Sequence, residues 1–282
     1  MRLISSFVLC VLLGSIPAMA AVELVLPGNS IVQGGIEPVY VIGALDTVTG
    51  TFDGEQLPFV RTAPDSFYTL LAVDMNKKPG SYELVVRPGL FDGKAEKLVR
   101  DITVLDAKFP VQKLTLPPAK VFPDSAATAR IKRETALRNR KWKAWSKRPY
   151  WSDKFIVPLK GELKRFGSRR VINGAARSPH SGVDISAPEG APVIAPAGGK
   201  VLLTGDFFFT GKTVYLDHGL GMIGMFFHLV EINVADGEMV EQGQVIGKVG
   251  STGRATGPHL HWGIRWRGKR INPASLLELK LD

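Results

Sequence analysis

The sequence predicts a mainly β protein, with a small β-sandwich-like domain near its N-terminal end, a basic linker that contains a helix, and a second β region at its C-terminal end. The 282 residues include 30 glycines and 19 prolines, which suit short strands joined by tight turns better than a helical bundle. The composition, 45% hydrophobic and 22% charged, is ordinary for a folded chain and excludes an intrinsically disordered one. At roughly 150 residues per domain, the length predicts about two domains.

The first segment, residues 1–20, has the pattern of a signal peptide. Arg2 precedes the apolar run Ile4–Leu13, and Ala18-Met19-Ala20 provides the small residues of a cleavage site. This run is too short to span a bilayer, and no later segment approaches the required length. We therefore expect an exported protein, periplasmic or extracellular, without a transmembrane anchor. The single cysteine, Cys10, lies inside this segment, so the mature chain would have no disulfide.

Residues 21–106 predict a small antiparallel sandwich. Alternating runs such as Val22–Leu26 and Ser81–Val86 are separated by turn residues, as in compact β domains. This part contains no histidine and no cluster of chemistry-bearing residues. We expect an accessory domain, and the sequence leaves open whether it inhibits, targets or spaces the rest of the chain.

Residues 107–150 predict a basic, proline-containing linker with one helix. Asp124 or Ser125 is a suitable N-cap for a helix over Ala126–Trp145. The segment Lys120–Arg148 contains ten lysines and arginines but only two acidic residues, so it holds most of the net charge of +10.

Two interpretations of this basic segment remain open. It could dock on an anionic envelope polymer, with tryptophans stacking on sugars. Alternatively, Trp142 and Trp145 pack on a domain while the charges stay solvated, and this second interpretation is favoured because aromatic side chains bury large apolar area.

A pI near 9.7 also raises nucleic acid as a partner. Export argues against it, and we expect no nucleic acid.

Residues 151–282 contain all five histidines, which is the main functional signal. His180 and Asp184 would lie about 13 Å apart in a straight strand, but Pro179 and Gly182 permit a bend that brings them together. His259 and His261 are two residues apart, so on a strand they share one face. Two histidines and one aspartate leave a fourth tetrahedral position open for water, the pattern of a catalytic zinc site. A single histidine could also be a satisfied core residue.

Several motifs in this region strongly resemble those of the lysostaphin-type zinc endopeptidases, which cut peptidoglycan peptide bridges. The resemblance covers about Phe155–Pro273, and the motifs occur in the family's order. They are His180-Ser181-Gly182-Val183-Asp184-Ile185 with Ala187-Pro188, then Phe227-His228-Leu229, Gly243-Gln244-Val245-Ile246-Gly247, and Thr252-Gly253 through Gly257-Pro258-His259-Leu260-His261.

The resemblance implies an antiparallel β metallopeptidase domain that binds one Zn²⁺ per chain. It implies that His180, Asp184 and His261 are the metal ligands. It further implies that His228 and His259 form the catalytic pair, with no division of tasks between them.

Two positions depart from the family's pattern. Phe226 stands where a tyrosine is common, and Gly263 stands where an acidic residue is common. Neither departure affects the implied ligands or the catalytic pair.

Three further residues are candidates of lower rank. Asn173 and Arg177 precede the metal motif and could bind substrate or shape the active-site loop. His218, in Asp217-His218-Gly219, is not needed for the metal, and turn chemistry at a strand end explains it.

The function expected from these residues is hydrolysis of peptide cross-links in bacterial peptidoglycan by an exported zinc endopeptidase. The alternative is a non-catalytic envelope protein that binds cell wall or activates another cell-wall hydrolase. A secreted nucleic-acid binder would rest on the pI alone.

Overall fold

The computed structural model confirms a mainly β protein. It describes residues 22–43, 45–90, 96–115, 123–143, 145–152 and 154–279. The expected signal peptide, including Cys10, lies outside these residues. In the part of the chain that the structure describes, no helix is both long and apolar enough to cross a bilayer.

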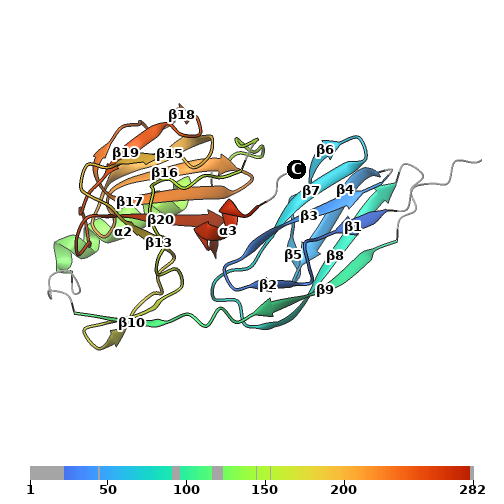
Figure 1. Cartoon of the computed structure of the whole chain (residues 1–282), viewed down its shortest axis with the longest axis horizontal. Coiled ribbons are helices and arrows are strands. Elements are labelled where there is room, and N and C mark those ends of the chain that lie inside the picture. The colour runs from blue at the N-terminus through green and yellow to red at the C-terminus, as the bar shows by residue number, and fades with distance from the viewer. Residues whose placement is uncertain are drawn as a thin grey trace, which may run out of the picture.

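The N-terminal half is a sandwich of two sheets (Figure 1). Alternation places Val39 and Val41 of one sheet and Leu84 and Val86 of the other in a shared apolar core. The expectation of purely antiparallel pairing is wrong at one place, because β2 and β9 pair in parallel. One sheet has the order β1-β3-β7-β6 and the other β2-β9-β8-β4-β5, from β1 (Glu23–Val25), β2 (Ser30–Val32), β3 (Ile36–Ile42), β4 (Leu45–Phe52), β5 (Glu55–Gln56), β6 (Val60–Ala63), β7 (Ser66–Ala72), β8 (Gly80–Leu90) and β9 (Leu98–Leu105).

The linker is more ordered than the sequence indicates, because its first part forms strand β10 (Val111–Leu114). This strand pairs in parallel with β11 (Arg169–Ile172), which in turn pairs with the short β12 (Ala175–Ala176). The result is a small three-stranded sheet beside the C-terminal half (Figure 1). Residues before the helix and residues after it therefore lie side by side.

Helix α2 (Ser125–Lys141) starts where the sequence predicts and ends earlier. The Asp124 side chain caps it by accepting a hydrogen bond from the backbone N–H of Ala127 at 2.7 Å. The helix ends at Lys141 rather than near Trp145, and Trp142 is its C-cap. Trp142 then packs edge-on against Tyr215 of the C-terminal sheet, with ring centroids 6.1 Å apart.

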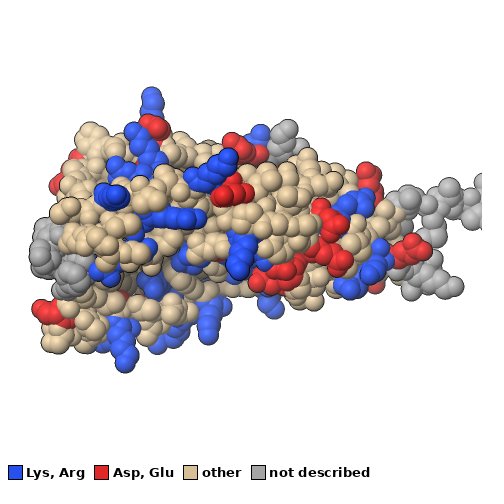
Figure 2. Space-filling model, turned by 90° about the horizontal axis from the view of Figure 1, so that it is seen from below, with Lys and Arg blue, Asp and Glu red and all other residues tan. Residues whose placement is uncertain are grey.

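The packing interpretation of the basic segment is confirmed for Trp142. This residue and Leu137 cover a small apolar cluster on the outer face of the C-terminal sheet. Lys132, Arg133 and Arg140 remain exposed on the same helix. On the face drawn in Figure 2, lysine and arginine side chains are most frequent over this C-terminal half of the molecule.

The C-terminal half is built on a nine-stranded antiparallel sheet whose main path is β13-β20-β17-β16-β15-β18. Large side chains such as Trp262, Trp266 and Phe226 are fully buried in it. Because β20 lies between β13 and β17, residues from three separate motifs meet on its face. The elements are β13 (Gly182–Ser186), β14 (Pro192–Ile194), β15 (Gly199–Phe207), β16 (Gly211–Gly219), β17 (Met222–Ile232), β18 (Met239–Val240), β19 (Val245–Val249), β20 (His259–Trp266), β21 (Lys269–Ile271) and helix α3 (Pro273–Leu277).

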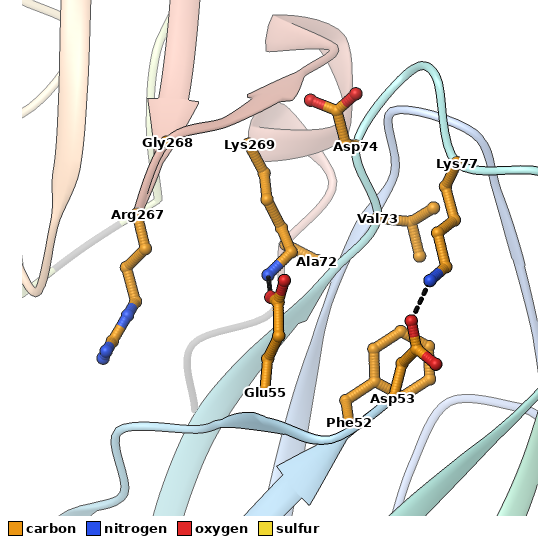
Figure 3. A pocket seen from close by; sticks show the side chains of 10 residues that line it. All are labelled: Phe52, Asp53, Glu55, Ala72, Val73, Asp74, Lys77, Arg267, Gly268 and Lys269. Atoms are coloured by element: carbon orange, nitrogen blue, oxygen red, sulfur yellow. Dashed lines mark hydrogen bonds and ion pairs between the residues drawn. The ribbon is translucent and has the colours of Figure 1, made fainter.

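The two halves share one continuous apolar core and are joined by polar contacts. The carboxylate of Asp74 accepts hydrogen bonds from the Arg270 backbone N–H at 2.8 Å and from its guanidinium at 2.6 and 3.0 Å. Burial opposes ionisation of Asp74, but the Arg270 hydrogen bonds hold its pKa below the ordinary value. Figure 3 shows the adjoining pocket, where Lys269 pairs with Glu55 across the boundary. The halves are therefore held in a fixed relation.

Candidate metal centre and its groove

Strand pairing brings the three candidate ligands together. Asp184 of β13 is the direct cross-strand partner of His261 on β20. His180 lies just before β13, where its backbone N–H bonds to the Ser168 carbonyl and its carbonyl accepts from Gly167. These bonds turn the chain, so the expected bend between His180 and Asp184 is present.

The ligand atoms form a tight triangle. Nε2 of His180 lies 3.0 Å from Oδ1 of Asp184, and Nδ1 of His261 lies 3.1 Å from the same oxygen. The two ring nitrogens are 2.8 Å apart. A tetrahedral zinc with bonds of about 2.0–2.1 Å separates its ligands by roughly 3.3 Å, so this donor set fits zinc closely. All three residues are buried.

The surroundings fix which ring nitrogens face the centre. Nδ1–H of His180 donates to the Arg165 carbonyl at 2.9 Å, which leaves Nε2 as a lone-pair donor toward the other two ligands. The ring of His261 is stacked on Phe227, with centroids 5.0 Å apart and planes at 5°. Gly182 leaves room for this ring, because a Cβ there would lie 2.6 Å from Nε2 of His261 and 2.5 Å from the Trp262 carbonyl oxygen.

The electrostatics favour the protonation states that bind a cation. Burial alone would raise the pKa of Asp184, but its close contacts with His180 and His261 hold that pKa well below the ordinary value. Burial lowers the pKa of His261 to about 3. Near neutral pH the cluster therefore presents a carboxylate and a neutral imidazole, as metal ligation requires.

His259 and His228 lie beside this triangle and are oriented alike. Nδ1–H of His259 donates to the Gly257 carbonyl at 2.8 Å, and its Nε2 lies 3.8 Å from Oδ1 of Asp184. Nδ1–H of His228 donates to the Thr252 carbonyl at 2.8 Å. The two rings are 4.9 Å apart. In both residues the nitrogen left for chemistry is Nε2.

His228 has an unusual backbone conformation and a side chain with a lowered pKa. Its backbone has a φ of +66°, a left-handed conformation that is costly outside glycine, at an irregular part of β17. Burial, followed by the proximity of His259, lowers the pKa of its side chain to about 4. A neutral imidazole at pH 7 has an unprotonated nitrogen that can accept a proton.

These residues line one groove of about 350 Å³, which includes groups that the sequence did not single out. Gln112 and Leu114 come from β10, and Arg138 comes from α2. Three further additions are Arg165, Arg170 and Arg254. None belongs to a local motif with a ligand spacing, so their positions depend on the pairing of β10 with β11 and on the loop before β20.

The lower-ranked candidates lie in different places. Asn173 has a φ of +50° at the Asn173-Gly174 turn between β11 and β12, a sequence suited to a tight hairpin, and does not line the groove. The backbone N–H of Arg177 bonds to the Arg170 carbonyl. Burial lowers the pKa of Arg254, and the charge of Arg177 adds to that effect. His218 is completely buried in the core, away from the groove lining.

At the two positions that depart from the family's pattern, the surrounding space is occupied by packed apolar side chains. Phe226 is fully buried. A Cβ at Gly263 would lie 2.6 Å from the Met225 side chain, so this methionine occupies the space beside β20.

A buried cluster of two imidazoles and one carboxylate, open on one side to a groove with two more histidines, defines the class of metal-dependent hydrolases. The model of Peptidase family M23 matches residues 178–273. A solved structure from Pseudomonas aeruginosa, described as a candidate peptidase M23, is 31% identical and aligns over 87% of this chain and 94% of that one, with a TM-score of 0.64. The chain belongs to peptidase family M23, which confirms the resemblance found in the sequence.

Two named relatives match a little more than a third of this chain. The DD-carboxypeptidase/endopeptidase Mpg of Neisseria meningitidis is 43% identical over 97 residues, 34% of this chain and 22% of the relative. The peptidoglycan DD-endopeptidase ShyA of Vibrio cholerae is 40% identical over 108 residues, 38% of this chain and 25% of the relative. The match thus spans about a quarter of the length of these relatives.

Proposed function

We propose that the protein is an exported zinc metalloendopeptidase that hydrolyses peptide cross-links of peptidoglycan. The observation that carries this proposal is the triangle of ligand atoms from His180, Asp184 and His261, with Nε2 of His228 and His259 available in the same groove. The names of the relatives Mpg and ShyA support peptidoglycan as the substrate. A peptidoglycan substrate and the expected signal peptide together support a location outside the cytoplasm.

Bound by the three ligands, one zinc ion would polarise the scissile carbonyl and lower the pKa of a water molecule. The protein's own residues supply the remaining chemistry. Neutral His228 can take a proton from the attacking water through Nε2, because its Nδ1–H is held by Thr252. His259 faces the same space with its Nδ1–H held by the Gly257 carbonyl. Its Nε2 can donate a hydrogen bond to the oxyanion and a proton to the leaving amine once it has received a proton, which the one removed from the water by His228 can supply.

The exposed lysines and arginines of α2 support a second, non-catalytic part of the proposal. Since Trp142 is used in packing, the charges rather than the tryptophan would contact an anionic envelope polymer. Lys120, at one end of the basic segment, lies outside the described residues. This docking would strengthen retention on the cell wall without affecting bond cleavage.

The test separates ligands from catalytic residues by metal content and rate. His180→Ala, Asp184→Ala and His261→Ala should each lose bound zinc together with activity. His228→Ala and His259→Ala should keep zinc and lose roughly 10²- to 10⁴-fold in turnover, the usual scale for a positioned acid or base. Elemental analysis of each purified variant is compared with its rate on defined cross-linked muropeptides, and mass spectrometry identifies the bond cut.

Glu189→Gln is the matched control, because Glu189 is exposed and does not line the groove. Loss of zinc in His259→Ala with retention in His261→Ala would reverse the ligand assignment. A zinc-loaded wild-type protein that cleaves no cross-link but binds cell wall would support the non-catalytic alternative.

A further inference from the structure

The groove beside the metal centre is strongly positive. Among the residues that the structure describes, four arginines line it, whereas Asp184 is its only acidic residue. Arg165 is already engaged, with its guanidinium 3.6 Å from Oδ2 of Asp184. Within the part of the chain that the structure describes, Arg170 and Arg254 have no carboxylate within ion-pair distance. Two guanidinium groups in the groove therefore lack a counter-ion.

Arg170 is held on a rigid wall of the groove. It lies on β11 directly across from Gln112 of β10, and both side chains line the groove. Nε of Arg170 is buried, as is Oε1 of Gln112, and neither atom has a hydrogen-bond partner. Buried polar atoms of this kind normally have partners, and the residues that the structure describes give neither of these two one.

Arg254 lies in the loop before β20 and adds a second guanidinium group to the lining of the groove. Its backbone N–H bonds to the Phe209 carbonyl at 2.9 Å, and its guanidinium lies 4.5 Å from the centre of the Phe209 ring. This cation–π contact holds the guanidinium beside the Phe209 ring. Burial lowers the pKa of Arg170, and the charge of Arg254 adds to that effect although Asp184 opposes it. An anion between the two arginines would relieve their repulsion.

We propose that Arg170 and Arg254 bind a free carboxylate of the peptide substrate, so that the enzyme prefers cross-links with an acidic residue next to the scissile bond. A guanidinium matches a carboxylate with two parallel hydrogen bonds, which fixes the direction of the peptide as well as its charge. The arginines and the metal ligands line the same groove, so one short peptide can reach both. This inference rests on the proposed function and adds the chemical class of substrate.

The experiment uses the full mature chain loaded with zinc and two synthetic cross-linked peptides. They differ only in a carboxylate or a carboxamide on the residue beside the scissile bond. For the wild-type protein we expect kcat/KM to be roughly ten- to a hundred-fold higher for the carboxylate peptide, as for one charge-assisted pair. In Arg170→Met and Arg254→Met this ratio should fall toward one, and Arg170→Lys should give an intermediate ratio.

Arg100→Met on the exposed side of β9 is the control and should keep the wild-type ratio. Equal rates for the two peptides in the wild type, or an unchanged ratio in both methionine variants, would overturn the inference. Calorimetry with the uncross-linked stem peptide, in its carboxylate and carboxamide forms, separates this result from the proposed function. A protein that cleaves neither peptide but binds the carboxylate form through Arg170 keeps the inference and loses the proposed function. Equal binding of both forms contradicts the inference.

Discussion

Replacing His218 by asparagine should remove a defined part of the protein's sensitivity to mild acid. His218 is completely buried on β16, where its Nδ1–H donates to the Gly198 carbonyl at 2.8 Å. Its ring packs edge-on against Phe155, with centroids 5.3 Å apart. Burial lowers its pKa from 6.5 to about 4, and the Gly198 bond offsets only part of this effect.

The sign of the pH dependence follows from the two pKa values. In the unfolded chain His218 takes up a proton near pH 6.5, whereas in the folded chain it does so only near pH 4. The unfolded state therefore binds more protons between these values, and stability is lost as the pH falls. At 1.36 kcal/mol per pKa unit, the wild type should lose about 2 kcal/mol at pH 5 and about 3 kcal/mol at pH 4 through this residue.

The assay is urea unfolding of the wild type and His218→Asn at pH values from 8 to 4. Asparagine keeps a donor for the Gly198 carbonyl but does not titrate, so its packing cost is the same at every pH. The buried His228 and His261 remain in both proteins and cancel in the difference. Identical pH slopes for the two proteins, or an NMR titration of His218 near 6.5, would refute the reasoning.

Two further predictions concern local packing. Gly182→Ala should destabilise the fold by about 1–3 kcal/mol and weaken zinc binding, because the new methyl group overlaps the His261 ring. Gly257 has open space around it, so Gly257→Ala is the control and should leave the zinc content unchanged in elemental analysis. Trp142→Ala should lower the free energy of unfolding by about 2 kcal/mol or more. Reversing the charges of Lys132 and Arg133 should instead leave stability nearly unchanged and weaken pull-down on insoluble peptidoglycan at low salt, and unchanged pull-down would contradict docking.

Much of the fold was predictable from local signals. Turn residues between alternating runs predicted the strands, and Asp124 predicted the start of α2 through its capping side chain. The parallel pairing of β10 with β11 was not predictable, because it joins segments on either side of α2 and depends on how the whole C-terminal half packs. The helix end was also missed, since it depends on the contact of Trp142 with a distant sheet.

For the site, the sequence by itself provided the candidate ligands and the two further histidines, because its motifs resemble those of a zinc endopeptidase family. Only the tertiary structure decided the rest: the shared oxygen of Asp184 between His180 and His261, the backbone carbonyls that leave Nε2 free, and the arginines of the groove wall. Spacing along a chain constrains residues a few positions apart. The side chains that meet across this groove come from strands, loops and a helix that are separated in sequence, and only the burial of a common core brings them together.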